Sequence, residues 1–534
     1  MKITGNQLIA GAWKASTSSS GFTAFDPSNS DALEPKFYDA TEAEVDEAMS
    51  RAKDAFDELR NKSADQRAQF LDCMADEVMA LGDGLLERAQ RETGLPLPRL
   101  TMERGRAVNQ CKMFANILRE GSWVDARIDL PNPDRQPVPK PDVRRMLKPI
   151  GPVVVFGASN FPLAISVFGS DTVSAIGAGC PVVVKAHPAH PGTCELLAEA
   201  IRRAVEKSGM PEGSFSLLQG VSNSVGAALV NHPASEAVAF TGSLRGGRAL
   251  MDLAAKRERP IPVYAEMGST NPVFVLPGAM AERGKAIAEG LIQSVNMGVG
   301  QFCTSPGIAL GIQSDALSQF SSQLSELVKS CPNASMLHKG IATAYANGLD
   351  RIKSTNEVKV VGHSEQAPDS IKTEASCHVF EATIETYLKE AQLAEENFGP
   401  STILLSGENE GSLKDFAESL DAQLTVTLHA NENDLINFQD LITILERKAG
   451  RLIINGFPTG LEVCASMQHG GPYPAASHSF FTSVGTASID RFVRPISYQG
   501  FPDSSLPIEL RNENTKNIWR LVDNVRTKDS VELK

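Results

Sequence analysis

The eight cysteines of this 534-residue chain lack the spacing that holds a metal ion or builds a disulfide framework. None stands in a Cys-x-x-Cys or Cys-x-x-His arrangement, so a finger-type or ribbon-type zinc site is not expected. We therefore expect free thiols, a reducing compartment and no bound metal. The cysteines are Cys73, Cys111, Cys180, Cys194, Cys303, Cys331, Cys377 and Cys464.

Basic runs interleaved with aromatic residues are also missing. The net charge is −13 and the isoelectric point is near 5.3, which repels nucleic-acid phosphates and anionic lipids. The first residues, Met1-Lys-Ile-Thr-Gly-Asn-Gln, lack the basic start and apolar core of a signal peptide. The sequence thus predicts no nucleic-acid or membrane partner and a cytoplasmic location.

One uncharged run, from Pro149 to Ser170, is long enough to span a bilayer. Pro149, Pro152 and Pro162 interrupt it, together with several glycines and polar residues, so a membrane helix is not the preferred interpretation. We predict a buried strand followed by the start of a buried helix.

The chain between Gly151 and Glu266 alternates short β-branched runs with helical stretches. Five buried strands with crossover-length connections predict a doubly wound parallel sheet in an α/β fold. The strands are expected at 153–156, 182–184, 215–218, 237–240 and 263–265. Helices are expected at 43–60, 64–81, 100–119, 194–207 and 243–256, the last capped by Ser243.

The pattern of strands and helices restarts after Gly268 and runs to about Gly471, which predicts a second α/β domain. At 534 residues the chain is too long for one ordinary core. The stretch from Asp125 to Lys148 holds five prolines among charged residues and predicts an exposed ribbon or arm.

Three sequence elements supply the parts of covalent acyl-type catalysis. Cys303, in Asn296-Met-Gly-Val-Gly-Gln-Phe-Cys-Thr-Ser-Pro306, is a candidate thiol nucleophile. Glu266, in Tyr264-Ala-Glu-Met-Gly268, is a candidate base that acts through water. Asn160, after an apolar strand, could donate to a developing oxyanion together with the Cys303 backbone amide.

Each residue also has an ordinary structural explanation. Cys303 could be a buried inert thiol, Glu266 a salt-bridged acid and Asn160 a turn residue before Pro162. Their occurrence together, in this order, favours the catalytic interpretation.

These elements resemble the aldehyde dehydrogenase superfamily over nearly the whole chain. Further motifs that carry the resemblance are Phe240-Thr-Gly-Ser243, Glu395-Glu-Asn-Phe-Gly-Pro400 and Gly5-Asn-Gln-Leu-Ile-Ala-Gly-Ala-Trp13. The segment Glu462-Val-Cys-Ala-Ser-Met-Gln-His-Gly-Gly-Pro-Tyr-Pro474, with Phe480–Thr486 and Arg494–Gln499, resembles the NADP-dependent branch that oxidises 2,5-dioxopentanoate (α-ketoglutarate semialdehyde).

The resemblance implies oxidation of an aldehyde to a carboxylic acid, here 2,5-dioxopentanoate to 2-oxoglutarate. Cys303 would form a thiohemiacetal, hydride would pass to nicotinamide, and Glu266 would deprotonate the water that hydrolyses the thioester. Three alternatives stay open: an apolar or fatty aldehyde, transfer of the acyl group to coenzyme A, and a catalytically silent binding protein. Glu266 argues against transfer to coenzyme A, because that route needs no hydrolytic base. The presence of Asn160, Glu266 and Cys303 together argues against a catalytically silent protein.

The resemblance also implies a division into domains and an oligomer. A cofactor-binding domain would comprise residues 1–126 and 149–265, and a catalytic domain residues 266–471. Residues 127–148 would pair with 487–503 in an oligomerisation arm of a homodimer or homotetramer. The tail, 504–534, would form a surface helix from Asn512.

No Gly-x-Gly-x-x-Gly motif follows the first predicted strand, so a standard Rossmann phosphate loop is absent. Gly177-Ala-Gly179 and Gly298-Val-Gly300 are interpreted as tight turns. The resemblance implies that the turn Thr241-Gly242-Ser243 receives the pyrophosphate at a helix N-terminus, although these residues could merely cap a helix.

Most other cofactor contacts follow from the resemblance. Lys185 would bind the adenosine ribose, Gly226 would lie in the cofactor groove, and Glu396 and Phe398 would hold the nicotinamide ribose and ring. Lys185 could instead be an ordinary strand-end lysine, and Glu396 part of a solvated acidic surface.

Pro188 stands where strictly NAD-preferring relatives commonly place a glutamate, which favours NADP, with NAD possible. His187 is nearby, and Arg202 or Arg203 follows one helix later, so a guanidinium could bind a 2′-phosphate.

Arg106 is the candidate for the distal carboxylate of the substrate. It shares one face of the predicted helix 100–119 with Met102, Gln110 and Met113. The alternative is an exposed arginine paired with Glu103 or Glu120. The apolar walls would come from Ile165, Phe168 and Phe302, and the mouth from residues 457–471. The stretches 158–159 and 269–271 depart from the common family pattern and are expected to shape the substrate pocket.

Overall fold

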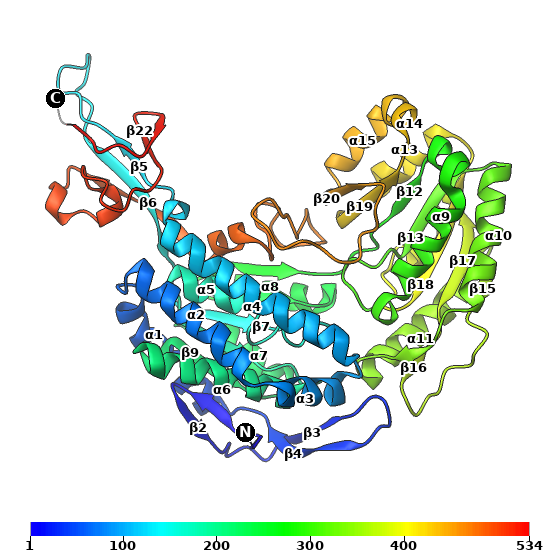
Figure 1. The fold of residues 1–534 in the computed structure, drawn as a ribbon, viewed down its shortest axis with the longest axis horizontal. Coiled ribbons are helices and arrows are strands. Elements are labelled where there is room, and N and C mark those ends of the chain that lie inside the picture. The colour runs from blue at the N-terminus through cyan, green and yellow to red at the C-terminus, as the bar shows by residue number, and fades with distance from the viewer. Residues whose placement is uncertain (1, 533–534) are drawn as a thin grey trace.

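The computed structural model describes residues 2–532 and contains two large α/β lobes and a projecting β-sheet arm (Figure 1). Each lobe is built on a seven-stranded sheet. Helices cover these sheets, and the central strands are largely buried, as expected when both faces of a parallel sheet are covered. The structure confirms the predicted α/β class with parallel sheets, while the domain boundaries stay predictions.

The first sheet has the strand order β11-β10-β7-β8-β9-β1-β2. Its five parallel strands are the five predicted runs, each within one residue of the expected ends. A hairpin from the N-terminus extends the sheet, because β1 pairs antiparallel with β9. The bounds are β1 (Gln7–Ile9), β2 (Ala12–Lys14), β7 (Val153–Phe156), β8 (Val182–Lys185), β9 (Phe215–Leu218), β10 (Ala237–Thr241) and β11 (Val263–Glu266).

Helices pack on both faces of this sheet, and the five predicted ones are confirmed. Capping boxes begin two of them, at Thr41 with Glu44 and at Ser63 with Gln66. The helices are α1 (Glu42–Leu59), α2 (Ala64–Ala80), α3 (Asp83–Thr93), α4 (Leu97–Glu120), α5 (Ser170–Ala178), α6 (Pro191–Ser208), α7 (Asn223–Asn231) and α8 (Leu244–Lys256). In the uncharged run, the strand is confirmed but helix α5 begins only at its end, after a turn that contains Asn160.

The second sheet has the order β15-β17-β18-β13-β12-β19-β20 and is parallel except for the edge pair β15 and β17. Its strands are β12 (Val273–Val275), β13 (Ile308–Ile312), β15 (Lys359–His363), β17 (His378–Thr383), β18 (Ser401–Gly407), β19 (Gln423–His429) and β20 (Ala449–Ile454). Its helices are α9 (Pro277–Asn296), α10 (Asp315–Lys329), α11 (Lys339–Ser354), α12 (Ile384–Lys389), α13 (Glu410–Ser419), α14 (Glu432–Asn437) and α15 (Gln439–Glu446). The predicted restart of the α/β pattern after Gly268 is therefore confirmed.

The arm is a five-stranded sheet of order β21-β6-β5-β22-β23. The predicted pairing is confirmed, since β6 (Val143–Pro149) runs antiparallel to β21 (Val493–Gln499) over their whole length. Strand β5 (Arg127–Asp129) lies on the other side of β6.

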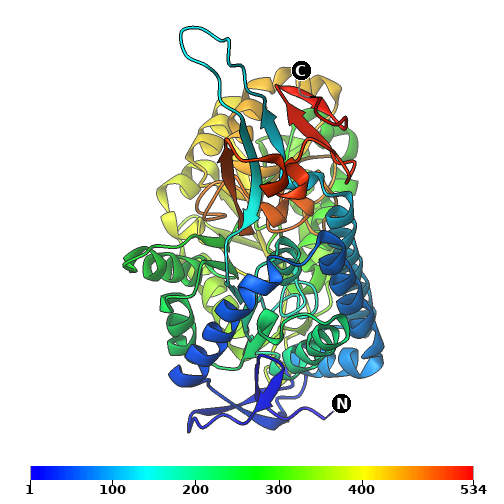
Figure 2. The same ribbon diagram turned by 90° about the vertical axis from the view of Figure 1, so that its left-hand side faces the viewer.

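The predicted tail helix from Asn512 is wrong. Strands β22 (Arg520–Val522) and β23 (Val525–Thr527) lie there and join the arm sheet, as Figure 2 shows in red beside the cyan hairpin. The buried Arg520 guanidinium donates to the carbonyls of Arg511, Asn512 and Asp529, so it ties the tail back on itself. These contacts, together with the pairing of β22 with β5, outweigh the local helix preference of the charged tail.

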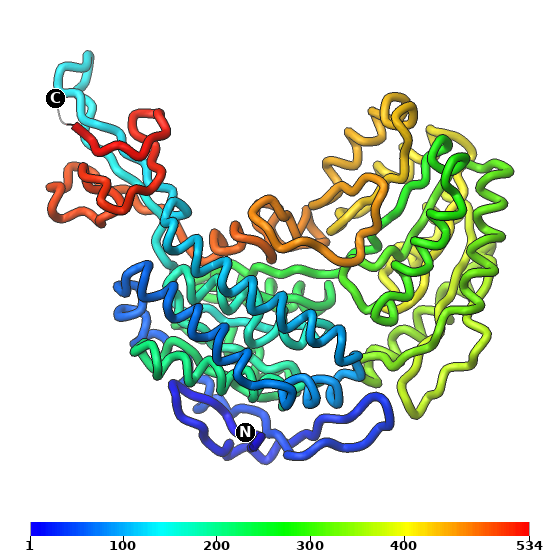
Figure 3. The backbone as a smooth tube through the Cα atoms, in the orientation of Figure 1, coloured from blue at the N-terminus to red at the C-terminus, as the bar shows by residue number. Residues whose placement is uncertain are grey.

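Two small antiparallel pairs complete the structure: β3 (Gly21–Phe25) with β4 (Ala32–Tyr38), and β14 (Ala334–Ser335) with β16 (Glu374–Ala375). Residues 455–485 carry no regular helix or strand and run from the second lobe back to the first, in orange in Figure 3. Within residues 2–532, no helix combines the length and apolar character needed to cross a membrane.

Candidate active site

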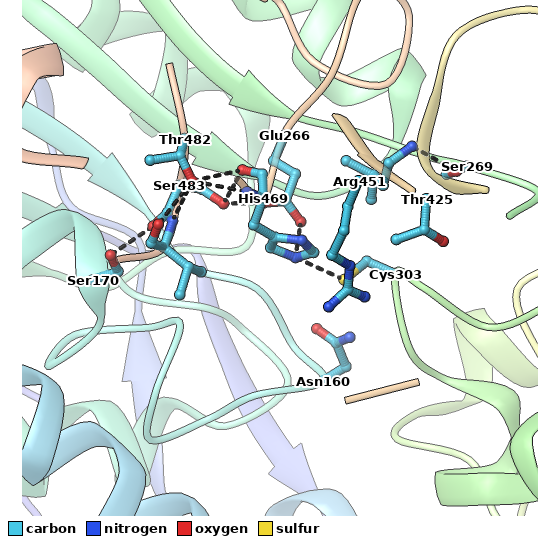
Figure 4. Close-up of polar contacts among 12 residues, drawn as sticks. Asn160, Ser170, Glu266, Ser269, Cys303, Thr425, Arg451, His469, Thr482 and Ser483 are labelled. Carbon is cyan, nitrogen blue, oxygen red and sulfur yellow. Dashed lines mark hydrogen bonds and ion pairs between the residues drawn. The ribbon is translucent and has the colours of Figure 1, made fainter. Parts of the chain in front are cut away.

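Asn160, Glu266 and Cys303 come together between the two lobes (Figure 4). Asn160 follows β7 and Glu266 ends β11, and these strands flank β10, so their carboxyl ends meet at one edge of the sheet. Cys303 arrives from the second lobe, and Asn160 Nδ2 donates to the carbonyl of Gln301, two residues before it, at 3.0 Å. The structure therefore assembles the trio that the sequence suggested.

A left-handed turn presents Cys303. Helix α9 ends at Asn296, and Gly298, Val299 and Gly300 then have φ values of 56°, 58° and 63°. Valine rarely adopts this region, so the turn is strained at Val299. A Cβ on Gly300 would lie 2.2 Å from the Gly399 backbone, so glycine allows the nucleophile loop to approach the Glu396–Phe398 loop. The interpretation of Gly298 and Gly300 as turn residues is confirmed.

Asn271 holds the nucleophile loop in place. Its Nδ2 donates to the carbonyls of Cys303 at 2.9 Å and of Ser305 at 3.0 Å, while its Oδ1 accepts from Thr425 Oγ1 at 2.8 Å. Ser269 and Gln423 complete this buried network. We expected residues 269–271 to shape the substrate pocket, but Asn271 binds the backbone that carries the nucleophile.

The imidazole of His469 lies between the Cys303 thiol and the Glu266 carboxylate. The sequence alone did not predict a role for His469. Its Nε2 is 3.4 Å from Cys303 Sγ and 3.2 Å from Glu266 Oε1 (Figure 4). His469 and Glu266 are 1% and 4% exposed. The available signal was a single histidine in the Gly-rich Met467-Gln-His-Gly-Gly471 segment, far from the trio in sequence.

Residues 469 and 482–483 fix this arrangement from the segment that runs between the lobes. The His469 amide donates to Thr482 Oγ1 at 2.8 Å, and the Ser483 amide donates to the His469 carbonyl at 2.8 Å. The Ser483 hydroxyl donates to the second carboxylate oxygen of Glu266. Glu266 Oε1 thus contacts the His469 ring and Oε2 accepts from Ser483, and these two contacts orient the carboxylate.

The protonation states follow from burial and neighbouring charge. Burial alone would raise the pKa of Glu266, but the contacts with His469 and the hydrogen bond from Ser483 outweigh it and lower that pKa. Burial and the nearby Glu266 carboxylate raise the pKa of Cys303 well above its ordinary value. At neutral pH the Glu266 carboxyl is therefore ionised and the Cys303 thiol is protonated.

Helix α4 anchors the loop that carries Asn160. Glu103 accepts from the amides of Leu163 at 2.8 Å and Ala164 at 3.0 Å, and Arg99 Nη2 donates to the Asn160 carbonyl at 3.0 Å. The Arg99 guanidinium also lies 4.7 Å from the ring centre of Phe161. The oxyanion candidate is thus held by side chains from a separate helix.

The first lobe offers a surface that fits a dinucleotide. Ser243 caps helix α8 and accepts from the Gly246 amide at 3.2 Å, which confirms the predicted cap, and residues 242–245 are exposed. The first amides of a helix lack partners within the helix, and its dipole favours a phosphate there. Thr241 and Gly242 lie in the same turn, and Gly226 in α7 packs against Phe156 at this edge.

Lys185 ends β8 at the same edge. Its amine donates to the Gly220 carbonyl, and burial lowers the pKa of Lys185 to about 8. His187 stacks on His190 at 5.2 Å, and burial with neighbouring positive charge lowers the pKa of His187 well below its ordinary value. A neutral His187 is a hydrogen-bonding group rather than a cation at neutral pH.

Arg203 does not reach this edge. It follows the start of α6 by about three turns, so it lies toward the opposite edge of the sheet, and its Nε pairs with Glu77 Oε2 at 2.9 Å. The predicted contact of Arg203 with a 2′-phosphate is therefore not supported, because the helix carries the residue away from the cleft.

Glu396 and Phe398 line a pocket together with Phe302 and Ser269, beside the nucleophile loop. Solvent reaches Glu396, but the walls of the cleft disfavour its charge, and this desolvation raises the pKa of its carboxyl to about 7. The placement fits the predicted contact with a nicotinamide ribose.

The predicted substrate residues divide into two groups. Arg106 is half-buried, its guanidinium lies 5.4 Å from the ring centre of Phe161, and its charge acts on Cys303 and Glu266. Phe302 contacts Phe161 edge-on at 5.5 Å, and Ile165 is partly exposed. Phe168, by contrast, is 1% exposed and belongs to the hydrophobic core, so its ring offers no open wall.

A second guanidinium, that of Arg451 on β20, points toward Cys303 in Figure 4. Its Nη2 donates to the Pro458 carbonyl at 2.9 Å, and its charge acts on the thiol. The sequence does not predict a role for Arg451, because one arginine within a strand carries no local signal of a site.

Two parallel-sheet lobes with a thiol, an acid and an amide donor between them define an α/β enzyme of the cysteine-nucleophile type. Residues 13–475 match the aldehyde dehydrogenase family, and the chain belongs to that family. It is an oxidoreductase that acts on aldehydes through a cysteine thioester.

Among relatives, an enzyme of Azospirillum brasilense named alpha-ketoglutaric semialdehyde dehydrogenase 2 is 47% identical over 98% of this chain and 99% of its own length. An alpha-ketoglutaric semialdehyde dehydrogenase of Acinetobacter baylyi is 46% identical over 92% of this chain and 93% of its own. Among solved structures, betaine aldehyde dehydrogenase of Staphylococcus aureus in complex with NAD+ has a TM-score of 0.79 at 19% identity, covering 93% of this chain and 95% of that one. This likeness establishes the fold.

Proposed function

We propose that this enzyme oxidises 2,5-dioxopentanoate to 2-oxoglutarate with a nicotinamide dinucleotide. The observation that carries the chemistry is the contact of His469 Nε2 with both Cys303 Sγ at 3.4 Å and Glu266 Oε1 at 3.2 Å. The observation that carries the substrate is the name of two relatives at 46–47% identity over nearly the whole chain.

In the reactive tautomer His469 carries its proton on Nδ1, so its Nε2, which already contacts the sulfur, accepts the proton of Cys303 as the sulfur adds to the aldehyde carbon. The negative charge of Glu266 stabilises the imidazolium that forms, as a carboxylate does for a catalytic histidine. Asn160 Nδ2 turns from the Gln301 carbonyl to the oxyanion, a contact worth about 3 kcal/mol in comparable sites.

Loss of hydride from the tetrahedral carbon leaves a thioester on Cys303. A nicotinamide dinucleotide, when bound, accepts that hydride. Glu266, with its lowered pKa, is ionised and can deprotonate a water that attacks the thioester. This retained base supports hydrolysis over transfer to coenzyme A.

For the cofactor we propose NADP, with NAD as an alternative. Support comes from Pro188, since a carboxylate at this position would repel a 2′-phosphate. Arg203 does not contribute, because Glu77 holds it. The proposed preference for NADP therefore depends on two features. No carboxylate stands at position 188 to repel a 2′-phosphate, and His187 is a neutral hydrogen-bond donor.

For the distal carboxylate we propose Arg106, assisted by Arg451. The Nε of each guanidinium is buried without a hydrogen-bond partner among the described residues, while both charges act on Cys303. A buried donor without a partner favours an anionic ligand that can supply an acceptor.

The test is a substrate panel of 2,5-dioxopentanoate, hexanal and betaine aldehyde, run separately with NAD and NADP and read by the absorbance of the reduced cofactor. We expect the highest kcat/KM for 2,5-dioxopentanoate with NADP. A preference for hexanal would replace the dicarboxylate assignment with an apolar aldehyde.

We propose further that the arm joins subunits of a homodimer or homotetramer. Its edge strands β21 and β23 have free backbone groups on one side in the described chain, and such edges pair with another chain. Light scattering on the purified protein gives the mass; a monomer at micromolar concentration would contradict this assignment.

A further inference from the structure

Cys303, His469 and Glu266 also form a set of metal ligands. One ligand atom from each residue lies within 4.8 Å of the others, and the three come from separate segments: the nucleophile loop, the end of β11 and the segment between the lobes. Thiolate, imidazole and carboxylate are the three ligand types that Zn²⁺ takes from proteins. No Cys-x-x-Cys spacing exists to reveal such a set in the sequence.

Two of the three ligand separations match a tetrahedral zinc centre. Zn–N and Zn–O bonds of about 2.0 Å and a Zn–S bond of about 2.3 Å place neighbouring N and S ligands about 3.5 Å apart, and N and O ligands about 3.3 Å apart. The corresponding distances are 3.4 Å for His469 Nε2 to Cys303 Sγ and 3.2 Å for His469 Nε2 to Glu266 Oε1. The third pair, Cys303 Sγ and a Glu266 oxygen, lies within 4.8 Å. His469 therefore needs little rearrangement to receive the ion.

The charges balance when an ion binds. A Cys303 thiolate and the Glu266 carboxylate supply two negative charges, and a neutral His469 supplies none, so Zn²⁺ is neutralised. The thiol releases its proton to solvent, and the imidazole proton moves to Nδ1. Ser483 donates to the remaining Glu266 oxygen and so acts as the supporting contact that orients a metal-binding carboxylate.

Other charges face the set. Arg106 and Arg451 oppose a cation, whereas Glu396 opposes a free thiolate and so favours its neutralisation by a cation. Because the set supplies three protein ligands among the described residues, the fourth tetrahedral position is left for water.

We propose that a thiophilic divalent cation, Zn²⁺ or Cd²⁺, binds Cys303, His469 and Glu266 and reversibly inhibits the enzyme. The ion occupies the nucleophile and the base at once, so a metal-loaded site cannot form the thiohemiacetal. This regulation goes beyond the proposed function, because it depends on the geometry of the three side chains and not on the identity of the aldehyde.

Direct binding tests the site without turnover. The full-length, metal-free enzyme is titrated with Co²⁺, and the absorption of a tetrahedral cobalt–thiolate centre is followed; Zn²⁺ should displace the cobalt at one ion per chain. Each of the variants Cys303→Ser, His469→Gln and Glu266→Gln removes a metal ligand and should weaken cobalt binding by more than about 100-fold. Changes to residues that only support the ligands already cost about 10- to 100-fold in metal affinity.

Cys73→Ser is the matched control. Cys73 is a partly exposed thiol on α2, distant from the site, with Asp72 and Asp76 as neighbours on the same helix. This variant should bind cobalt and be inhibited by Zn²⁺ like the unmodified enzyme, and a chelator should restore activity in both. Circular dichroism checks that each variant is folded.

Unchanged cobalt binding in folded Cys303→Ser and His469→Gln would overturn the proposal, as would its loss in Cys73→Ser. Because the readout is cobalt absorption, a protein that fails to oxidise 2,5-dioxopentanoate but still binds the ion would contradict only the proposed function.

Discussion

Asn271 Nδ2 donates a 2.9 Å hydrogen bond to the carbonyl of Cys303, so a buried amide fixes the backbone of the nucleophile. Asn271 itself has a φ of 47°, a left-handed conformation that asparagine tolerates better than most residues. This geometry gives Asn271 the role of positioning the nucleophile loop rather than of contacting the substrate.

Asn271→Ala should lower both kcat and stability. Two carbonyls lose their donor, so we expect about 2 kcal/mol less free energy of unfolding and, from a displaced sulfur, a fall in kcat of up to about 100-fold. Denaturant unfolding and steady-state kinetics measure the two effects. Asn409→Ala, which removes the cap of α13 by way of its bond to the Ser412 amide, should cost about 1 kcal/mol and leave kcat unchanged.

His469→Gln should slow turnover by about 10²- to 10⁴-fold, because proton transfer from the sulfur loses its acceptor. Glutamine keeps a donor beside Glu266, so the fold should persist. The measurement is kcat at saturating substrate and cofactor. An unchanged kcat would show that His469 is only a packing residue.

Glu266→Gln should lower the pKa of the Cys303 thiol. The Glu266 carboxylate disfavours the thiolate, so removing its charge moves ionisation of Cys303 to lower pH. Alkylation by iodoacetamide without cofactor should then become faster at neutral pH, while turnover falls because the hydrolytic base is gone. Slower alkylation would mean that Glu266 acts as the base for the thiol.

Arg106→Met should reduce kcat/KM for 2,5-dioxopentanoate by about 10- to 100-fold, the effect of losing a charge-assisted hydrogen bond of about 1.5–3 kcal/mol. Hexanal oxidation should change little, since it has no carboxylate. Arg119→Met on the same helix, where the arginine pairs with Asp72 on the surface, is the control and should affect neither substrate. A parallel loss with both aldehydes would assign Arg106 a structural role.

Arg491→Met should destabilise the first lobe. Arg491 Nη2 lies 2.8 Å from Asp171 Oδ1 with both residues buried, and removal of one partner of such a pair costs about 3–5 kcal/mol. The midpoint of thermal unfolding should fall. The double variant Asp171→Leu/Arg491→Met should recover part of the loss; an identical midpoint in both variants would argue against the pairing.

Much of the fold could be predicted from local patterns. Runs such as Val153–Phe156 are apolar on both faces, and this periodicity fixes a strand almost to the residue. The trio could be found because each member stands in a motif at a strand end or a Gly-rich turn.

The remaining residues depended on contacts between distant segments. His469 acquires its role from the path of residues 455–485 between the lobes, and Asn271 from the loop that it meets 32 residues later. Arg203 was placed by sequence proximity, but the length of α6 carries it to Glu77. The tail forms strands because β5 offers it an open edge, a feature of the assembled arm alone.

Because β22 pairs with β5, the C-terminal strands β22 and β23 belong to the arm sheet. A premature stop codon near Asn514 would remove β22 and β23 and leave the backbone hydrogen-bonding groups along one side of β5 without partners. An exposed edge of this kind recruits foreign strands. Shortened products would thus aggregate even though every catalytic group was still encoded.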